Sequence, residues 1–159
     1  MDFQALDQAL AAIGNVSQAS PPGLVTVCRN PESQFVNVLY SAPIRVSGEA
    51  GTVLVDTGAT VTILQPDSAI GRKLQNRSVS GGQTQGVGGA SEAERRVPGV
   101  RLERGGSTVE LQPALARVSP GCGHDGLLGM DALRNCVLVL GERTMAVSCH
   151  DAASVRDTK

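Results

Sequence analysis

Short runs of apolar residues, many of them alternating with polar ones, follow one another along most of the chain, with glycine or proline between them. Runs of this length and period predict β-strands joined by turns rather than long helices. The predicted strands are residues 24–28, 35–40, 44–46, 52–55, 61–64, 97–102, 108–111, 115–118, 136–140 and 145–149. Residues 52–55 are continuously apolar, as expected of a strand buried on both faces. The pattern therefore predicts an all-β domain with a compact, barrel-like or sandwich arrangement.

Helical spacing occurs in three places. Residues 69–74 and 130–135 are each long enough for a short helical turn. Near the N-terminus, four apolar residues recur at helical spacing with polar residues between them: Phe3, Leu6, Leu10 and Ile13. They predict a short amphipathic helix that ends near Gly14. The predicted organisation is an N-terminal helix (1–16), a linker rich in Ser, Pro and Gly (17–23), a β-domain (24–149) and a polar, frayed tail (150–159).

Composition supports one folded domain with an aliphatic core. The chain has 159 residues, of which 41% are hydrophobic and 18% are charged. These values suit a packed domain and are too apolar for a disordered chain. Aromatic residues make up only 2%, without any Trp, so Val, Leu, Ile and Ala must form the core.

The charge balance excludes a strongly basic or acidic surface. Lys and Arg number 14, Asp and Glu number 15, and the net charge is −1. Nucleic-acid binding needs a clustered excess of basic residues, and the adjacent pair Arg95 and Arg96 is better explained as a solvated strand edge. No apolar run approaches about 18 residues, so we expect no membrane span. The N-terminus has no signal-peptide pattern, which favours the cytoplasm, although a periplasmic or membrane-anchored longer form stays open.

Four cysteines and two histidines do not form a metal site by spacing. No Cys-x-x-Cys occurs, and neither histidine lies at ligand spacing from a cysteine, so we expect neither a metal nor another cofactor. Cys136 and Cys149 lie symmetrically about the last predicted hairpin and should face each other across its two strands. A disulfide there needs suitable Cβ geometry, and we expect the two thiols to be reduced.

The strongest chemical signal is an acid directly after an apolar strand. Residues 53–60 read Val-Leu-Val-Asp-Thr-Gly-Ala-Thr, so the strand delivers Asp56 to a fixed position. Gly58 allows the chain to bend there without strain at a Cβ, and Thr57 offers a hydroxyl that can lock the turn. Asp-Thr-Gly alone is also common as a plain turn.

Three segments in order resemble the retropepsin-like aspartic proteases. Asp56-Thr57-Gly58-Ala59, with apolar residues on both sides, resembles the active-site segment of that family. Residues 86–89 (Gly-Val-Gly-Gly) look like the tip of its flap hairpin. Residues 126–133 look like the segment that precedes its short helix. The resemblance covers about residues 44–149 and implies a small, closed-barrel-like acid protease fold with one short helix.

This resemblance implies an endopeptidase that is a homodimer. One Asp-Thr-Gly per chain supplies one catalytic carboxylate, and the family forms its site across a two-fold axis, where two Asp56 carboxylates activate a water. The implied partners are a second copy and a peptide or protein substrate. The implied catalytic residues are Asp56, Thr57 and Gly58, and the implied substrate-binding residues are Ala59, Thr60, Gly86, Val87, Gly88, Gly89 and Leu128. The terminal strands of both subunits interleave in the family, and residues 145–149 are the expected counterpart here.

Two positions depart from the retroviral branch. Retroviral members often carry an acid where this chain has Thr60 and an arginine where it has Met130, and those residues pair. Here both are neutral, which removes a charge pair without leaving one charge unpaired. The departure favours a bacterial or cellular branch of the family.

The other acids near these motifs are expected to be structural. Asp67 suits a turn or a helix N-cap, and Asp131 suits the first turn of a short helix, where the helix dipole favours a negative charge. Asp125 and His124 lie in a predicted loop. His124 and Asp125 are adjacent, but no nucleophile has a context that would complete a triad.

Two further interpretations stay open. The polar strand before the flap tip and the neutral Thr60 and Met130 leave room for a catalytically silent, dimeric peptide-binding or adaptor module. A weaker possibility is an inactive precursor that stays monomeric until the N-terminal helix or a tail is removed. Cleavage of peptides by the intact chain distinguishes the first interpretation from the enzyme.

Overall fold

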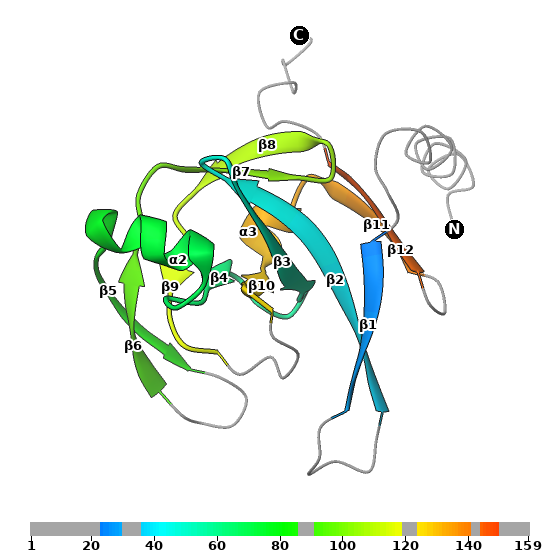
Figure 1. The fold of residues 1–159 in the computed structure, drawn as a ribbon, viewed down its shortest axis with the longest axis horizontal. Coiled ribbons are helices and arrows are strands. Elements are labelled where there is room, and N and C mark those ends of the chain that lie inside the picture. The colour runs from blue at the N-terminus through cyan, green and yellow to red at the C-terminus, as the bar shows by residue number, and fades with distance from the viewer. Residues whose placement is uncertain (1–22, 30–35, 86–90, 119–123, 141–143, 150–159) are drawn as a thin grey trace, which may run out of the picture.

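The computed structural model describes residues 23–29, 36–85, 91–118, 124–140 and 144–149 (Figure 1). The predicted N-terminal helix, the first residues of the linker, the flap tip and the polar tail lie outside these residues. Within them, no helix is both long and apolar enough to cross a membrane.

Strands dominate the described residues, so the predicted all-β fold is confirmed. In chain order the strands are β1 (Gly23–Arg29), β2 (Val36–Val46), β3 (Glu49–Val55), β4 (Ile63–Leu64), β5 (Val79–Gln85), β6 (Ser91–Arg96), β7 (Val100–Arg104), β8 (Ser107–Leu111), β9 (Ala114–Leu115), β10 (Gly126–Leu128), β11 (Cys136–Leu140) and β12 (Thr144–Cys149). The short helices are α2 (Ala69–Leu74), the 3-10 turn η1 (Gln75–Arg77) and α3 (Met130–Leu133).

The strands form one hydrogen-bonded path in the order β11-β12-β1-β2-β3-β10-β4-β9-β6-β5, with β7 on β2 and β8 on β7. Most neighbours are antiparallel, whereas β10 runs parallel to β3 and β4 runs parallel to β9. Figure 1 shows the long, curved β2 crossing the molecule, with α2 on one side and the β11–β12 hairpin on the other. Among the described residues, β11 and β5 are the two ends of this path.

The strand β2 is longer than the sequence pattern predicts. Residues 35–40 and 44–46 were expected to be two separate strands. In the structure Pro43 lies inside one continuous strand, opposite Thr52 of β3. Conversely, only the second half of the predicted strand 97–102 is a strand, because Val97-Pro98-Gly99 turns the chain between β6 and β7.

The core is aliphatic, as the composition predicts. The fully buried side chains include Leu64 and Leu128 from the inner strands and Ile70 and Leu74 from α2. All four belong to one apolar cluster, so α2 is held against the sheet by burial of its apolar face. Its N-cap is Ser68, whose hydroxyl oxygen accepts a hydrogen bond from the Gly71 amide at 2.9 Å. The N-cap is therefore Ser68 and not the preceding Asp67, for which a turn or N-cap role was expected.

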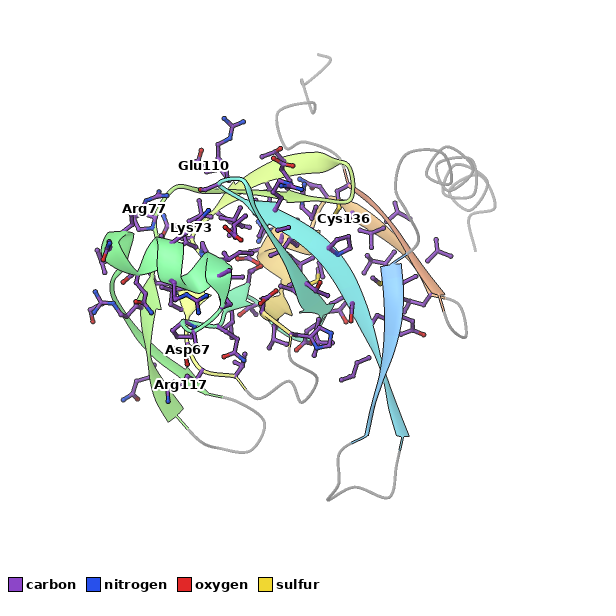
Figure 2. All side chains as sticks on the ribbon, in the orientation of Figure 1. Asp67, Lys73, Arg77, Glu110, Arg117 and Cys136 are labelled. Atoms are coloured by element: carbon purple, nitrogen blue, oxygen red, sulfur yellow. A yellow bond between two sulfur atoms is a disulfide. The ribbon has the colours of Figure 1, made fainter. Side chains whose placement is uncertain are left out.

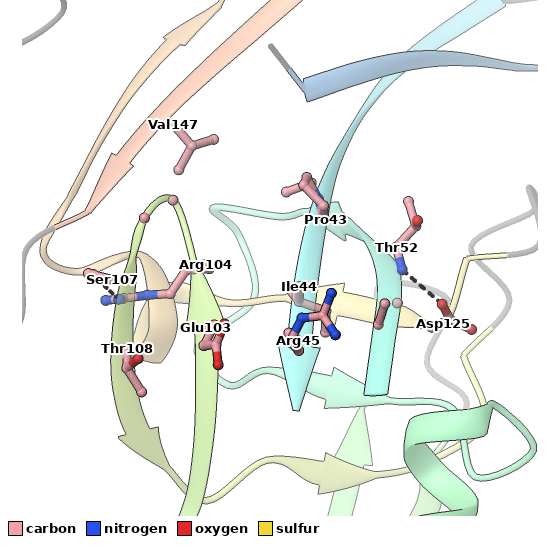
Figure 3. A pocket seen from close by; sticks show the side chains of 15 residues that line it. Pro43, Ile44, Arg45, Thr52, Glu103, Arg104, Ser107, Thr108, Asp125 and Val147 are labelled. Carbon is pink, nitrogen blue, oxygen red and sulfur yellow. Dashed lines mark hydrogen bonds between the residues drawn. The ribbon is translucent and has the colours of Figure 1, made fainter. Parts of the chain in front are cut away.

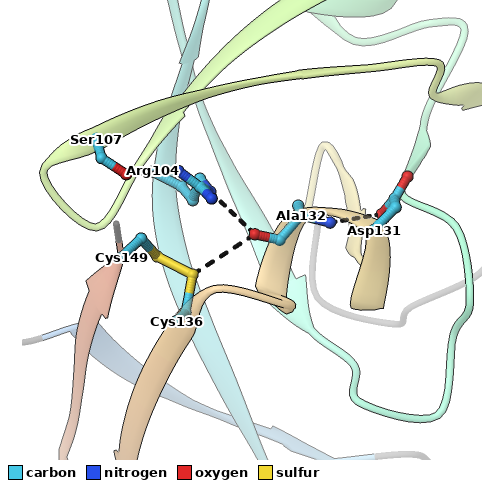
Figure 4. The surroundings of a disulfide bond; sticks show 6 residues. All are labelled: Arg104, Ser107, Asp131, Ala132, Cys136 and Cys149. Atoms are coloured by element: carbon cyan, nitrogen blue, oxygen red, sulfur yellow. Dashed lines mark hydrogen bonds between the residues drawn. A yellow bond between two sulfur atoms is a disulfide. The ribbon is translucent and has the colours of Figure 1, made fainter. Parts of the chain in front are cut away.

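The last hairpin has the predicted register and an unexpected covalent bond. Cys136 lies directly opposite Cys149, and the two form a disulfide, so the expectation of two reduced thiols is wrong (Figure 4). The sulfur of Cys136 also lies 3.5 Å from the Ala132 carbonyl oxygen at the end of α3. The amide of Cys149 donates to the Gly105 carbonyl at 3.1 Å. The disulfide therefore lies where α3 and the β7–β8 turn meet.

Candidate active site

Two neighbouring inner strands, β3 and β10, hold Asp56 at the end of β3. Val53 and Leu54 of β3 are buried, and the strand ends one residue before Asp56. β10 lies alongside in parallel, with Leu128 next to Val55. The Asp56 amide donates to the Leu128 carbonyl at 3.0 Å, so β10 fixes the backbone of the acid.

The residues after Asp56 form a tight turn around its carboxylate. The Gly58 amide donates to Asp56 Oδ1 at 2.9 Å, and the Ala59 amide donates to the Asp56 carbonyl at 3.2 Å. Asp56 is half-buried, whereas Thr57 and Gly58 are exposed. Among the described residues, no donor binds the other carboxylate oxygen, Oδ2. The carboxylate is thus oriented by one oxygen while the other is available for chemistry.

The turn rests on the segment that leads into α3. The Met130 amide donates to the Ala59 carbonyl at 2.8 Å, and the Asp131 amide donates to the Thr60 carbonyl at 3.2 Å. These two bonds tie the Asp-Thr-Gly turn to a segment far away in the sequence. Thr60 itself is exposed and Ala59 is half-buried.

Asp131 is the central acceptor beneath this turn. Its Oδ1 accepts hydrogen bonds from the Thr62 amide at 2.8 Å, the Thr62 hydroxyl at 2.6 Å and the Ala132 amide at 2.9 Å. Thr62 is completely buried, and its hydroxyl oxygen accepts from the Gly129 amide at 3.2 Å. Asp131 therefore joins the residue before β4 to α3, and its expected place in the first turn of a short helix is confirmed. The extent of its hydrogen bonding was not predicted.

Gly129 is required where these segments cross. A Cβ built on it would lie 2.5 Å from the Val61 carbonyl carbon, a distance that real side chains do not tolerate. The close approach of the two backbones is what allows the Met130 and Asp131 amides to reach the turn.

A small apolar cluster contains Val61, which follows the Asp-Thr-Gly turn closely in the chain. It contains buried Ile63, Ala114 and Ala116, against which Val61, Val118 and Leu127 pack while staying partly exposed. Leu128, a predicted substrate contact, is 0% exposed and belongs to the main core, and its carbonyl holds Asp56. Its neighbour Leu127 faces the small cluster instead. The alternation of side chains along a strand separates these two leucines, and the sequence alone did not say which faced outward.

The predicted flap is partly described. β5 and β6 pair antiparallel from Val79 opposite Arg96 to Gln85 opposite Ser91. The hairpin therefore brackets the Gly-rich segment at the expected place. Gly86, Val87, Gly88 and Gly89 lie outside the described residues, so their contact with substrate stays a prediction.

One histidine lies close to the loop that carries β10. His124 is 6% exposed, and its Nε2 is 2.6 Å from the hydroxyl oxygen of Ser41. Its Nδ1 is buried without a hydrogen-bond partner. Burial lowers the pKa of His124 from its ordinary value of 6.5, and the nearby Asp125 charge opposes that shift. This environment favours the neutral imidazole.

One pocket of the domain, which Asp56 does not line, contains a different acid. It has a volume of about 660 Å³ and lies between the β2–β3 and β7–β8 hairpins, with Asp125 at its edge (Figure 3). Figure 3 shows the Asp125 carboxylate turned toward the Thr52 amide, at 2.8 Å. The Asp125 carboxylate is therefore held by the backbone of β3, and the other acidic side chain of this pocket is Glu103 of β7. The described residues hold no group of three metal-binding side chains.

Comparison with known protein families finds a match over the middle of the chain. Residues 42–132, more than half of the chain, match the family described as aspartyl protease. The matched segment contains the Asp56 turn, the β5–β6 hairpin and the start of α3. Comparison with curated proteins found no match.

Proposed function

Because the chain belongs to the retropepsin-like aspartyl protease family, we propose that it is an endopeptidase whose active form is a homodimer. The observation that carries the proposal is Asp56, half-buried at a strand end and oriented through one oxygen by the Gly58 amide. The sequence holds one Asp-Thr-Gly, so each chain supplies one such carboxylate. Proteins of this family usually work as dimers and bind peptides.

In the proposed dimer the two Asp56 carboxylates meet across a two-fold axis. Two carboxylates about 3 Å apart do not both ionise at low energetic cost, so they share one proton, as is general for aspartic proteases. The ionised member takes a proton from a water, which attacks the scissile carbonyl carbon. The protonated member donates to the carbonyl oxygen, giving a tetrahedral diol that then collapses with release of the amine. Thr57 and Gly58 are proposed to keep both loops rigid, Thr57 by bonding across the axis.

The open strand β11 is the proposed dimer edge. The interleaving strand was expected to be residues 145–149, but β12 already pairs with β11 on one side and with β1 on the other. Among the described residues β11 pairs only with β12, and its sequence is Cys-Val-Leu-Val-Leu with Leu140 57% exposed. An apolar strand with an unpaired edge is a template for pairing with another strand. A second copy supplies that strand symmetrically.

The apolar cluster beside Asp56 supports binding of aliphatic side chains. Val61, Val118 and Leu127 are partly exposed there, on a wall without charged residues. The β5–β6 hairpin is proposed to close over the bound peptide, with Val87 and the neighbouring glycines in contact with it. Closure would exclude water from the carboxylates.

The test is cleavage of a mixed peptide library between about pH 3 and 8 by the parent and by Asp56→Asn, which can no longer exchange a proton. Cleavage by the parent alone supports the proposal, and the cut sites give the specificity. A folded dimer that cuts nothing at any pH contradicts it and favours the silent peptide-binding module. Equal cleavage by both proteins rejects Asp56 as the catalytic acid.

A second arm tests the shared site. Parent and Asp56→Asn protein are mixed in equal amounts at a constant total concentration, so that random exchange forms mixed dimers with one normal carboxylate. Activity should then be about one quarter of that of the same total amount of parent alone. A fall to about one half instead indicates that each chain acts alone.

A further inference from the structure

A second pocket lies beside the base of the β5–β6 hairpin, away from Asp56. It has a volume of about 580 Å³ and is lined by residues of η1, β6 and β9 and of the segments next to them. Two of its lining side chains are arginines, Arg95 and Arg117, and none of the described lining residues is acidic. Two guanidinium groups that face one cavity repel each other unless an anion lies between them.

Arg95 is held in a fixed orientation. Its Nε donates to the Ser78 hydroxyl at 2.6 Å, and its Nη2 donates to the Ser78 carbonyl at 2.8 Å. The Ser78 hydroxyl in turn donates to the Gln75 carbonyl at 2.6 Å, and Ser78 itself is buried. A guanidinium has five N–H donors, so Arg95 keeps donors for a ligand while the others fix its plane.

Arg117 reaches the same pocket from the segment that follows β9. Arg95 lies opposite Leu115 in the β6–β9 ladder, and Arg117 is two residues beyond Leu115, where β9 has ended. The Asp67 carboxylate lies 3.6 Å from Arg117, but both side chains are more than 70% exposed, at 74% and 77% (Figure 2). Such a solvated ion pair holds its members weakly. A ligand can therefore take over the Arg117 contact.

The pocket is one strand away from the apolar wall of the active site. Ala116 lines the pocket and also belongs to the small cluster with Ile63. Arg95 belongs to β6, the strand that leads back from the predicted flap tip. A group bound between the two arginines would thus lie beside the cleft and would connect the hairpin base to the body of the domain.

We propose that Arg95 and Arg117 form a binding site for a carboxylate group. The paired, forked donors suit a planar carboxylate, and the apolar Leu115 and Pro66 leave room for the carbon chain that carries it. The carboxylate belongs to an acidic residue of the polypeptide substrate, outside the residues bound at Asp56, or to a free small acid. The polypeptide version rests on the proposed protease function.

The experiment compares peptides that differ only in charge. A peptide cut by the parent is extended at either end with Glu-Glu or with Gln-Gln. For the parent, kcat/KM for the better Glu-extended peptide should exceed that for its Gln twin by about tenfold, since a charge-assisted contact is worth roughly that factor. Arg95→Gln and Arg117→Gln should each remove most of this preference, mainly through KM. Arg101→Gln, an exposed arginine of β7 outside the pocket, should keep it.

Each outcome decides between the sources or rejects the site. Arg117→Gln alters no backbone contact, so it tests the site even where Arg95→Gln unfolds the hairpin base. A free acid is the ligand if citrate or succinate stabilises the parent but not Arg117→Gln, and if the parent shows no preference for Glu-extended peptides. Equal cleavage of Glu and Gln peptides, with no effect of either acid on thermal unfolding, overturns the proposal. The protease function is tested separately with the Gln-extended peptides, which carry no added carboxylate. The parent should cleave them, and Asp56→Asn should not.

Discussion

Asp56 and Asp131 show how two carboxylates close to one another in the fold take different roles. Asp131 Oδ1 accepts three hydrogen bonds from Thr62 and Ala132. Asp56 accepts one, from Gly58. Three donors on one oxygen make Asp131 a structural tie between the residue before β4 and α3. Asp56 has a single donor, which belongs to its own turn, and its proposed catalytic role rests on the Asp-Thr-Gly motif.

Replacing Asp131 should destabilise the domain more than replacing any exposed acid. Asp131→Ala leaves the Thr62 amide and hydroxyl without their acceptor, and we expect a loss of about 2–4 kcal/mol in the free energy of unfolding. Asp131→Asn keeps one acceptor oxygen and should lose less. Urea unfolding measures both. The control is Asp67→Ala, whose exposed ion pair with Arg117 should contribute no more than about 1 kcal/mol. Equal effects of the two alanine variants would refute the structural role.

His124 should make the fold less stable in mild acid. Burial lowers its pKa below 6.5, so the unfolded chain binds a proton at a pH where folded His124 is still neutral. The unfolded state then carries more bound protons, and the free energy of unfolding falls as the pH falls below about 6.5, until the folded pKa is reached. Above pH 7 this group contributes no pH dependence.

The measurement is the free energy of unfolding from pH 7.5 to 5 for the parent and for His124→Gln. Glutamine is polar and does not titrate, so its curve should be flatter in this range. Identical slopes would mean that other groups cause the acid sensitivity. Residues other than His124 would then determine how far the pH can be lowered before the domain unfolds.

At individual positions, the sequence identified the candidate chemical residue but not the hydrogen-bond partners that are distant in the chain. The Asp-Thr-Gly after an apolar strand pointed to Asp56, because strand ends and glycine turns leave a local pattern. The partners of Asp131 and Ser41 did not leave one: Thr62 lies far from Asp131 in the chain, and His124 far from Ser41. Contacts between distant segments depend on how strands cross, which a single sequence does not encode locally.

The β11–β12 hairpin illustrates the same limit for elements. Both strands and their register were predictable, because two apolar runs flank a polar turn and the cysteines are equidistant from it. Whether the thiols are joined depends on the distance between their Cβ atoms, which the pattern does not give. The continuous strand β2 was also not predicted. Pro43 cannot donate a backbone hydrogen bond, yet it lies within β2 opposite Thr52, and the pattern does not show at which position a strand can include a proline.

The Cys136–Cys149 disulfide should stabilise the domain through this hairpin. It closes a loop with a sequence separation of 13, for which restriction of the unfolded chain predicts about 3 kcal/mol. A reducing agent should therefore lower the denaturation midpoint of the parent. The double variant Cys136→Ser/Cys149→Ser should start lower and show no response to the reducing agent. An unchanged denaturation midpoint of the parent in the reducing agent would contradict a stabilising disulfide.

The bond also bears on where the protein works. Disulfides persist in oxidising compartments and are rare in the cytosol. The disulfide therefore weighs against the cytoplasmic expectation, which rested on the absence of a signal pattern.

For the molecule as a whole, two features each call for a second chain. The proposed mechanism needs two Asp-Thr-Gly carboxylates and the chain supplies one, Asp56. Among the described strands, β11 is paired on one side only. Leu140, at the end of β11, and Val79, at the start of β5, are both large exposed apolar residues, at 57% and 54%. They lie at opposite ends of the strand path, so only one of them is next to the proposed dimer edge. This pair offers a matched comparison.

Leu140→Glu should weaken the dimer, whereas Val79→Glu should not. At a two-fold edge the new charge faces its own copy or is removed from water, and either effect should raise the dimer dissociation constant at least about tenfold. Sedimentation over a range of concentrations measures that constant. Because one chain holds a single Asp-Thr-Gly carboxylate, peptide cleavage by Leu140→Glu should fall at low protein concentration and recover at high concentration, where dimers form again. A loss that no concentration restores would mean that Leu140 acts on folding, and equal dimerisation of both variants would move the interface away from β11.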